Sequence, residues 1–292
     1  MRLVSYKSAE GVRVGGVRHG TCVDLARTDP SLPTAISALL ARWPDCRPAV
    51  ERAIDAGQPV PLAEIRLLPV VPAPRKIICV GLNYADHAAE TAAKPPSEPV
   101  IFNKFPTAIA GHWQPIELPP SSSEVDYEAE LVVVIGRGGR DIPAAHAMEH
   151  VAGYCCGNDI SARDWQMRKP GGQWLLGKSF DTFAPIGPSL VTADELPEPG
   201  RLAIELRLNG RVMQRSNTEQ LIFPVEALVA YVSAVCTLQP GDLIFTGTPG
   251  GVGFARKPPV FLKPGDVLEV EIEGIGVLSN PVVARRDASG GA

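Results

Sequence analysis

Short apolar runs separated by turn residues recur along most of this sequence. Runs of this length, bounded by glycine and proline, are typical of β-strands. From about residue 75 onward the pattern predicts strands at Ile77–Val80, Val100–Phe102, Glu130–Ile135, Leu202–Leu208, Asp242–Phe245 and Val267–Ile272. Asn209-Gly210 and Pro240-Gly241-Asp242 are turn sequences that fit between such strands.

Helical patterns are fewer. Apolar spacing predicts helices at Ala35–Ala56, Asn83–Ala93 and Pro224–Cys236, of which the last is apolar enough to be buried. Ser161 and Asp164 have the spacing of a capping box at the start of another short helix. The chain is therefore predicted to be α+β and β-rich.

A proline-rich segment, Pro69–Pro74, divides the chain into two parts. Before it, residues 1–72 are predicted to form a small N-terminal α/β domain that opens with a strand at Met1–Tyr6. After it, residues 73–284 contain the other predicted strands and form a larger domain. Residues 285–292 are mostly glycine, alanine, serine and charged residues, which predicts a disordered tail.

Composition narrows the class of partner. The formal net charge is −4 and both signs are spread along the chain, so no basic stripe predicts a nucleic acid or an anionic membrane as partner. The longest apolar helical stretch, Val225–Leu238, is shorter than a bilayer span and contains Glu226. Since the N-terminus lacks a signal-peptide pattern, the protein is expected to be soluble and cytoplasmic and to act on a small molecule.

The six cysteines show no Cys-x-x-Cys spacing, and Cys155 and Cys156 are adjacent, which is unfavourable for a disulfide. We expect most of the cysteines to be small buried apolar residues in a reducing compartment. A nucleophilic Cys155 or Cys156 is the alternative, although each lies in an apolar stretch.

The pair Glu128 and Glu130 stands at the head of the apolar run Leu131–Ile135. Side chains two apart on a strand leave the same face, about 7 Å apart, so the two carboxylates would repel each other unless a cation lies between them. Asp159 follows another apolar stretch and is the best candidate for a third ligand. Three carboxylates select a hard cation, with Mg²⁺ as first choice and Mn²⁺ as second.

Other interpretations of these acids remain open. Two neighbouring glutamates on a strand can be solvated surface residues, and Asp159 can cap a helix. Asp164 fits a capping-box carboxylate better than a metal ligand.

His87 and Glu90 are three residues apart, so on a helix their side chains are neighbours. A carboxylate beside an imidazole sets its tautomer and raises its basicity, which suits a general base. A solvated helix pair is the alternative.

Several further residues carry donors for an anionic ligand. Arg163 and Gln166 share a helix face, and Lys178 follows a glycine that allows close approach of the backbone. Such donors suit a substrate carboxylate and a developing oxyanion, although an arginine or lysine is more often a surface charge. The glycine-rich segment Thr246–Gly253 matches neither nucleotide-binding pattern, so we expect it to line a pocket with the hydroxyl of Thr248.

Taken together, these segments resemble the fumarylacetoacetate hydrolase family, over about two thirds of the chain from Lys76 to Val283. The resemblance is carried, in order, by Val-Gly-Leu-Asn-Tyr-Ala-Asp-His87, Asp-Tyr-Glu128-Ala-Glu130, Asn-Asp159-Ile-Ser-Ala-Arg163-Asp-Trp-Gln166, Gly-Lys178-Ser-Phe-Asp and Thr-Gly-Thr248-Pro-Gly-Gly-Val-Gly. Each motif alone is weak, whereas five in this order are highly specific. Gln173–Thr192 and Phe254–Val267 look most like the branch of that family called domain-containing protein 2.

The resemblance implies a mixed β-sandwich roll, a homodimer and a 2-oxo acid substrate that chelates the metal. It also implies site residues, as follows: Mg²⁺ held by Glu128, Glu130 and Asp159; His87 and Glu90 on a lid helix; Arg163, Gln166, Lys178 and Thr248 around the ligand. Two positions depart from the pattern. Val80 stands where the founding enzyme has a further metal-binding aspartate, and Leu82 stands where acylpyruvate-cleaving relatives often have arginine.

The function expected from these features is metal-dependent hydrolysis of a carbon–carbon bond in 2-oxo or 2,4-dioxo acids. His87 and Glu90 would activate water, while Lys178 would help to hold the negative charge of a metal-stabilised enolate. Keto–enol tautomerisation or decarboxylation of oxaloacetate, and hydration or isomerisation of a 2-oxo acid, are alternatives on the same site. A non-catalytic, metal-stabilised binding module is the alternative from another class.

Overall fold

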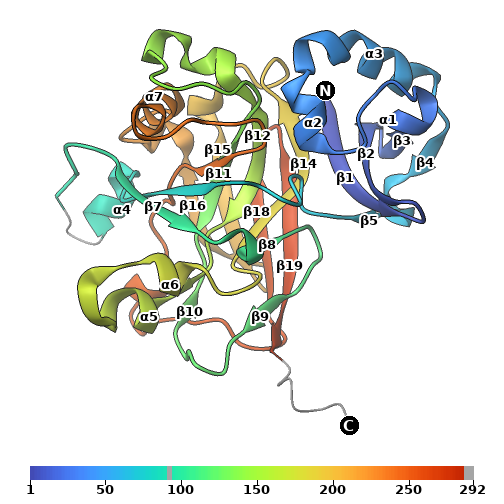
Figure 1. The fold of residues 1–292 in the computed structure, drawn as a ribbon. Coiled ribbons are helices and arrows are strands. Elements are labelled where there is room, and N and C mark those ends of the chain that lie inside the picture. The colour runs from blue at the N-terminus through green and yellow to red at the C-terminus, as the bar shows by residue number, and fades with distance from the viewer. Residues whose placement is uncertain (91–93, 286–292) are drawn as a thin grey trace.

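Two β-sheets form the framework of the computed structural model, which describes residues 1–90 and 94–285 (Figure 1). The larger sheet has the order β4-β3-β2-β1-β14-β12-β11-β17-β6-β7, and the short strands β5 and β8 pair with β1 and β14. Its strands are β1 Arg2–Ser8, β2 Gly11–Arg18, β3 Thr21–Asp24, β4 Pro59–Pro61, β5 Arg66–Leu67, β6 Ile77–Gly81, β7 Val100–Lys104, β8 Ile109–Ala110, β11 Ala129–Ile135, β12 Val151–Asn158, β14 Ala184–Thr192 and β17 Leu243–Phe245.

The second sheet has five strands in the order β16-β15-β18-β19-β9. They are β9 Ile116–Leu118, β15 Ala203–Leu208, β16 Arg211–Asn217, β18 Val267–Ile272 and β19 Gly276–Ala284; β10 Val125–Asp126 and β13 Ser161–Ala162 form a separate pair. The central strands β11, β12 and β14 of the large sheet pack against β15, β18 and β19. The predicted β-rich α+β class and the sandwich-like arrangement are confirmed.

Helices lie at the edges and ends of these sheets (Figure 1). The α-helices are α1 Leu25–Thr28, α2 Ile36–Ala41, α3 Trp43–Ala56, α4 Ala85–Glu90, α5 Arg163–Arg168, α6 Leu175–Lys178 and α7 Val225–Val235. The 3₁₀ turns are η1 Leu62–Glu64, η2 Pro106–Ala108, η3 Ala144–His150, η4 Pro170–Gly172, η5 Pro199–Arg201, η6 Thr218–Gln220 and η7 Gly253–Ala255.

The core is centred on β11 and β12, in which every residue is buried. The two strands are antiparallel, with Ala129 opposite Asn158 and Val132 opposite Cys155. A strand buried on both faces can be apolar at every position rather than at every second one. This explains the continuous apolar run Leu131–Ile135 and places the polar ends of both strands at one edge of the core.

The N-terminal strands belong to the same large sheet, because β1 pairs with β14 through Leu3 and Leu190. In Figure 1 the N-terminal strands and helices lie to one side of the central strands, next to β14. The division at residues 72 and 73 therefore stays a prediction. The proposed tail begins at Arg285, and its residues 286–292 lie outside the described residues.

All six strands predicted after residue 75 are present, as is the buried helix α7. The helix predicted over Ala35–Ala56 is two helices, α2 and α3, and the one predicted over Asn83–Ala93 is α4, with residues 91–93 outside the described part. The sequence patterns missed β14, which contains Pro185 and Pro188. Prolines are tolerated there because β14 pairs with β8 and β12 over different stretches and its register with β12 shifts.

The predicted capping box is wrong. Ser161 lies in β13 and its hydroxyl donates to the carbonyl of Asp159 at 2.9 Å, while helix α5 begins two residues later, after Ala162. The carboxylate of Asp164 accepts a hydrogen bond from the Ser122 hydroxyl at 2.7 Å. Pairing of Ser161 with Asp126 across β10 and β13 outcompetes the local cap.

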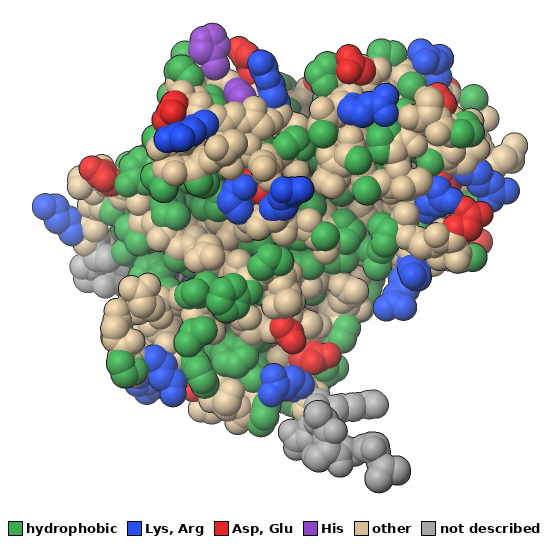
Figure 2. All heavy atoms as spheres, in the orientation of Figure 1, with side chains coloured by type: hydrophobic (Ala, Val, Ile, Leu, Met, Phe, Trp, Pro, Cys, Tyr) green, Lys and Arg blue, Asp and Glu red, His purple; other side chains and the backbone are tan. Residues whose placement is uncertain are grey.

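On the face in Figure 2, charged side chains of both signs are scattered among apolar ones. In the described part of the chain, none of the helices combines the length and apolar character needed to cross a membrane.

Cys155 and Cys156 are fully buried, and burial raises the pKa of both thiols, that of Cys156 to about 12, so neither suits a nucleophilic role.

Leu190→Ala is expected to lower the free energy of unfolding by about 2–5 kcal/mol, because β14 loses a fully buried side chain where the N-terminal strands join the sheet. Equilibrium urea denaturation measures the change. Val235→Ala is the control, since Val235 is 81% exposed and its truncation should change the value by about 0.5 kcal/mol or less. Equal stability of the two variants would contradict the role given to β14.

Candidate metal centre and active site

A cavity of about 230 Å³ lies where β6, β7, β11, α5 and α6 meet. Seven of the nine predicted site residues line it: His87, Glu128, Glu130, Arg163, Gln166, Lys178 and Thr248. The remaining wall is mainly apolar, from Val80, Leu82, Phe102, Met167, Trp174 and Phe254. Gly81 lets the Trp174 ring approach, since a Cβ there would lie 2.5 Å from a ring carbon.

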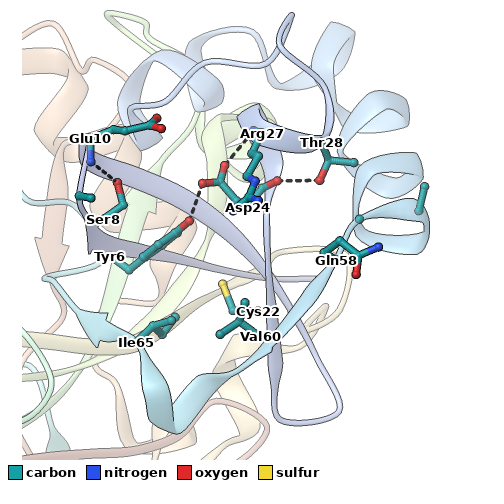
Figure 3. Close-up of a pocket in the computed structure, with 13 residues that line it drawn as sticks. Tyr6, Ser8, Glu10, Cys22, Asp24, Arg27, Thr28, Gln58, Val60 and Ile65 are labelled. Atoms are coloured by element: carbon teal, nitrogen blue, oxygen red, sulfur yellow. Dashed lines mark hydrogen bonds between the residues drawn. The ribbon is translucent and has the colours of Figure 1, made fainter.

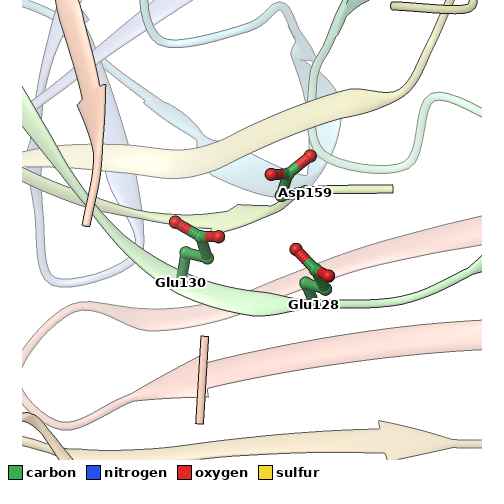
Figure 4. A group of neighbouring side chains, drawn as sticks. All are labelled: Glu128, Glu130 and Asp159. Carbon is green, nitrogen blue, oxygen red and sulfur yellow. The ribbon is translucent and has the colours of Figure 1, made fainter. Parts of the chain in front are cut away.

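Two of the lining carboxylates, Glu128 and Glu130, meet a third, that of Asp159 (Figure 4). Oxygen atoms of Glu128, Glu130 and Asp159 all lie within 4.8 Å of one another, and all three residues are buried. The arrangement follows from strand pairing. Ala129 is opposite Asn158, and the amide of Asp159 donates to the carbonyl of Glu128 at 2.8 Å, so Asp159 emerges beside the two glutamates.

Two buried lysines contact these carboxylates. Lys178 Nζ donates to Glu128 Oε2 at 2.7 Å and to Asp159 Oδ2 at 3.0 Å. Lys104 Nζ lies 2.5 Å from Asp159 Oδ1 and also donates to the carbonyls of Ile160 and Phe183. Glu128 and Asp159 therefore each contact a cation supplied by a neighbouring element.

Arg163 provides the third buried cation. Its Nε donates to Asp126 Oδ2 at 2.9 Å, its Nη2 lies 2.7 Å from Glu128 Oε1, and its Nη1 donates to Gln166 Oε1 at 2.9 Å. The guanidinium also lies 4.4 Å from the centre of the Phe254 ring. The predicted donors Arg163 and Gln166 are thus already joined to each other and to the acidic cluster.

The surroundings shift the pKa values of the two glutamates in opposite directions. Burial acts to raise the pKa of Glu128, but Lys178 and Arg163 outweigh it and lower that pKa to about 2. Burial and the charges of Asp159 and Glu128 raise the pKa of Glu130 well above its usual value. Glu130 Oε2 accepts a hydrogen bond from the Gly247 amide at 2.7 Å, which compensates it only in part.

The donor set fits a divalent cation. Among the described residues the cluster holds four buried carboxylates, Asp126, Glu128, Glu130 and Asp159, against the three buried cations Lys104, Arg163 and Lys178. Glu130, Glu128 and Asp159 offer three oxygens close enough to share one ion, and a bound cation favours the ionised form of each.

His87 and Glu90 lie on α4, and His87 lines the cavity. His87 Nδ1 is 3.4 Å from Glu90 Oε2, and both Glu90 oxygens accept from the Gly251 amide at 3.0 Å. Asp86 of the same helix accepts from the Ser216 hydroxyl at 2.5 Å. The predicted pair is thus present, and its helix is held against the glycine-rich loop.

Lys104, Asp126 and Gln214 are site residues that sequence reasoning missed. Asp126 stands in the motif that contains the two glutamates, so its position next to them was a usable signal. Lys104 on β7 and Gln214 on β16 stand alone in the sequence, and only the packing of their strands brings them to the site.

A larger cavity, of about 460 Å³, lies in the N-terminal part (Figure 3). Its half-buried acid is already paired: the Tyr6 hydroxyl donates to Asp24 Oδ2 at 2.6 Å, and Asp24 Oδ1 accepts from the Arg27 amide at 2.9 Å. We therefore place the candidate active site at the carboxylate cluster and not here.

The β-sandwich buries three converging carboxylates beside a small cavity, and carboxylate oxygens are the donors that hard divalent cations prefer. The chain belongs to the fumarylacetoacetate hydrolase family: the model of the fumarylacetoacetate (FAA) hydrolase C-terminal region matches residues 76–283.

Relatives cover nearly the whole chain. Oxaloacetate tautomerase fahd2, mitochondrial, from Xenopus laevis is 49% identical over 97% of this chain and 90% of its own length. Fumarylacetoacetate hydrolase from Exiguobacterium antarcticum has a TM-score of 0.87 and 37% identity, covering 98% of this chain and all of that one. Maleylpyruvate hydrolase from Sphingobium sp. SYK-6, in complex with manganese(II) and pyruvate, has a TM-score of 0.82 and 32% identity over 98% of this chain and 100% of its own.

The expected cytoplasmic location is wrong on these comparisons, because the Xenopus relative is named mitochondrial, as are those of human and cattle. Net charge and the absence of a long apolar run describe the surface of a folded protein. They do not distinguish one aqueous compartment from another.

Glu130→Gln is expected to stabilise the protein stripped of divalent cations at pH 8. A carboxyl whose pKa is raised on folding binds more protons in the folded state, so its contribution to stability falls as pH rises above the unfolded value of about 4.5. The advantage of the variant, measured by urea denaturation with chelator, should therefore grow from about pH 5 to about pH 8.

Glu149→Gln is the matched control, because Glu149 is exposed and pairs with His146 outside the cluster. Parallel stability curves for wild type and Glu130→Gln across this pH range would contradict the account of the Glu130 environment.

Proposed function

We propose that the protein catalyses keto–enol tautomerisation of oxaloacetate or a close 2-oxo acid, with Mg²⁺ or, second, Mn²⁺ held by Glu128, Glu130 and Asp159. The observation that carries the proposal is that His87 and two members of the carboxylate cluster, Glu128 and Glu130, line the same small cavity. The names of the relatives that span nearly the whole chain support the choice of reaction.

The sequence led us to expect hydrolysis of a carbon–carbon bond as the main reaction, with tautomerisation as an alternative. We now place tautomerisation first. Hydrolysis needs a water molecule held for attack beside the substrate, and the wall away from the charged cluster is mainly apolar, including Leu82, Phe102 and Trp174. Tautomerisation needs only one proton carried between carbon 3 and the keto oxygen. Hydrolysis is retained as an outcome of the assays below.

When bound, the divalent cation would supply Lewis acidity that stabilises negative charge on the 2-oxo oxygen. His87 is proposed to remove the proton from carbon 3 and to deliver a proton to the 2-oxo oxygen, which gives the enol; the same transfers in reverse regenerate the ketone. Its Nδ1 faces Glu90, an arrangement that favours a proton on Nδ1 and leaves the basic lone pair on Nε2. Glu90 is proposed to hold this tautomer and stabilise the imidazolium.

Lys178 and Gln166 are proposed to hold the substrate oxygens. Burial lowers the pKa of Lys178, but Asp159 and Glu128 outweigh it and keep the pKa above its usual value, so the ammonium stays charged. Gln166 Oε1 accepts from Arg163, so the amide nitrogen of Gln166 is the end that can donate to a ligand. A homodimer is also part of the proposal, by analogy with the family pattern.

The first test is metal dependence. Chelation should abolish loss of oxaloacetate enol absorbance above the background rate, and Mg²⁺ or Mn²⁺ should restore it. Glu130→Gln should bind Mn²⁺ at least about tenfold more weakly by titration calorimetry, whereas Glu149→Gln should bind as wild type does. Turnover that persists in chelator would remove the metal-based mechanism.

The second test concerns His87. His87→Asn should lower kcat about 10²- to 10⁴-fold, because the proton carrier is lost, with Mn²⁺ affinity retained. His146→Asn is the control, since His146 is exposed on η3. Pyruvate formation and acylpyruvate cleavage are followed in parallel to separate tautomerase from decarboxylase and hydrolase. Background rates for wild type with every 2-oxo acid would favour the binding-module alternative.

A further inference from the structure

Gln214 lies on β16, at the edge of the five-stranded sheet, and is 1% exposed. Its Oε1 accepts a hydrogen bond from the Ala129 amide at 2.8 Å. Its Nε2 donates to Thr248 Oγ1 at 2.8 Å and to the Pro249 carbonyl at 2.9 Å. One side chain therefore joins the second sheet, the strand of the metal ligands and the glycine-rich loop.

These partners determine the orientation of the amide. A backbone N–H can only donate, so the Gln214 oxygen must face Ala129. A carbonyl can only accept, so the nitrogen must face Pro249. Both hydrogens of Nε2 are then committed, one to Pro249 and the other to Thr248.

The orientation of Gln214 decides what Thr248 can offer. Because the Thr248 oxygen accepts from Gln214, its own hydroxyl hydrogen points elsewhere. Within residues 1–90 and 94–285, no other hydrogen-bond partner of this hydroxyl is found, and Thr248 lines the cavity. Thr248 can therefore present its hydroxyl hydrogen as a donor to a ligand.

The position of Ala129 links this donor to the metal ligands, since Ala129 stands between Glu128 and Glu130. Strand β17 pairs with β11 only at Val132–Val134, so the neighbouring strand has ended before Ala129. The Gln214 side chain takes the place of that strand at the Ala129 amide. It thereby ties the Thr248 hydroxyl to the segment that carries both glutamates.

We propose that Gln214 is a positioning residue that aims the Thr248 hydroxyl at an acceptor oxygen, such as a carboxylate, of the substrate bound beside the carboxylate cluster. The inference rests on the proposed function, because it takes the ligand to be a 2-oxo acid.

Oxalate, which carries only acceptor oxygens, is the probe, and its binding to Mn²⁺-saturated protein is measured by titration calorimetry. Thr248→Val should weaken oxalate binding about ten- to hundredfold, and Thr248→Ser should restore it, because the hydrogen bond is made to a charged acceptor. Gln214→Glu should cause a loss of similar size, because a carboxylate at this position accepts the Thr248 hydrogen instead of donating to its oxygen.

The double variant Gln214→Glu with Thr248→Val distinguishes action through Thr248 from a general effect. If Gln214 acts through the hydroxyl, the double variant should bind oxalate no more weakly than Thr248→Val alone. Gln58→Glu, at an exposed position, is the control for added charge. Should Gln214→Glu not fold, Gln214→Met removes the same hydrogen bonds without a charge and enters the same cycle.

The inference would be overturned if the Gln214 substitution weakened oxalate binding equally in the wild-type and Thr248→Val backgrounds. It would also be overturned if neither substitution changed oxalate binding, or if the wild-type protein did not bind oxalate. If the cycle behaves as expected but oxaloacetate is not turned over, the inference stands and the proposed tautomerase function fails. If turnover is retained while the Gln214 substitutions leave oxalate binding unchanged, the proposed function stands and the inference fails.

Discussion

The burial of four carboxylates around the head of β11 is the constraint on which the rest of the site depends. Asp126, Glu128, Glu130 and Asp159 are each 6% exposed or less. Charged groups in such surroundings are strongly destabilising unless cations and hydrogen-bond donors surround them. The elements around β11 supply them: Lys104 from β7, Arg163 from α5 and Lys178 from α6.

Two of these carboxylates, together with Glu90, hold the glycine-rich loop after β17. The amides of Gly247, Gly251 and Gly253 donate to Glu130, Glu90 and Asp126 respectively. Gly247 and Gly251 have φ values of 104° and 102°, which residues with a Cβ rarely adopt. The loop is thus held by acids from β10, β11 and α4, and this ties the helix of His87 to the carboxylate cluster.

Stability and chemistry conflict at Glu130. Its carboxylate has only partial compensation from the protein, and this leaves negative charge that a divalent cation can use. A neutral side chain there would suit the metal-free fold better and would remove one of the three carboxylates proposed to hold the metal. Such residual destabilisation is common where a site is built for binding and not for the stability of the empty fold.

Local sequence was sufficient for much of this protein. Apolar runs predicted six strands and α7, and Glu128 and Glu130 were placed on one side because side-chain direction on a strand depends only on spacing. The His87 and Glu90 pair followed from helical spacing in the same way.

Only the tertiary structure decided the relations between segments far apart in the chain. The pairing of β11 with β12 brings Asp159 to the glutamates, and strand packing brings Lys104 and Gln214 to the site from distant positions. Ser161 does not cap the helix as predicted, because it pairs with Asp126 of β10 instead. Spacing in a sequence describes neighbours along one element, whereas charge compensation at a buried site is decided by whichever elements pack around it.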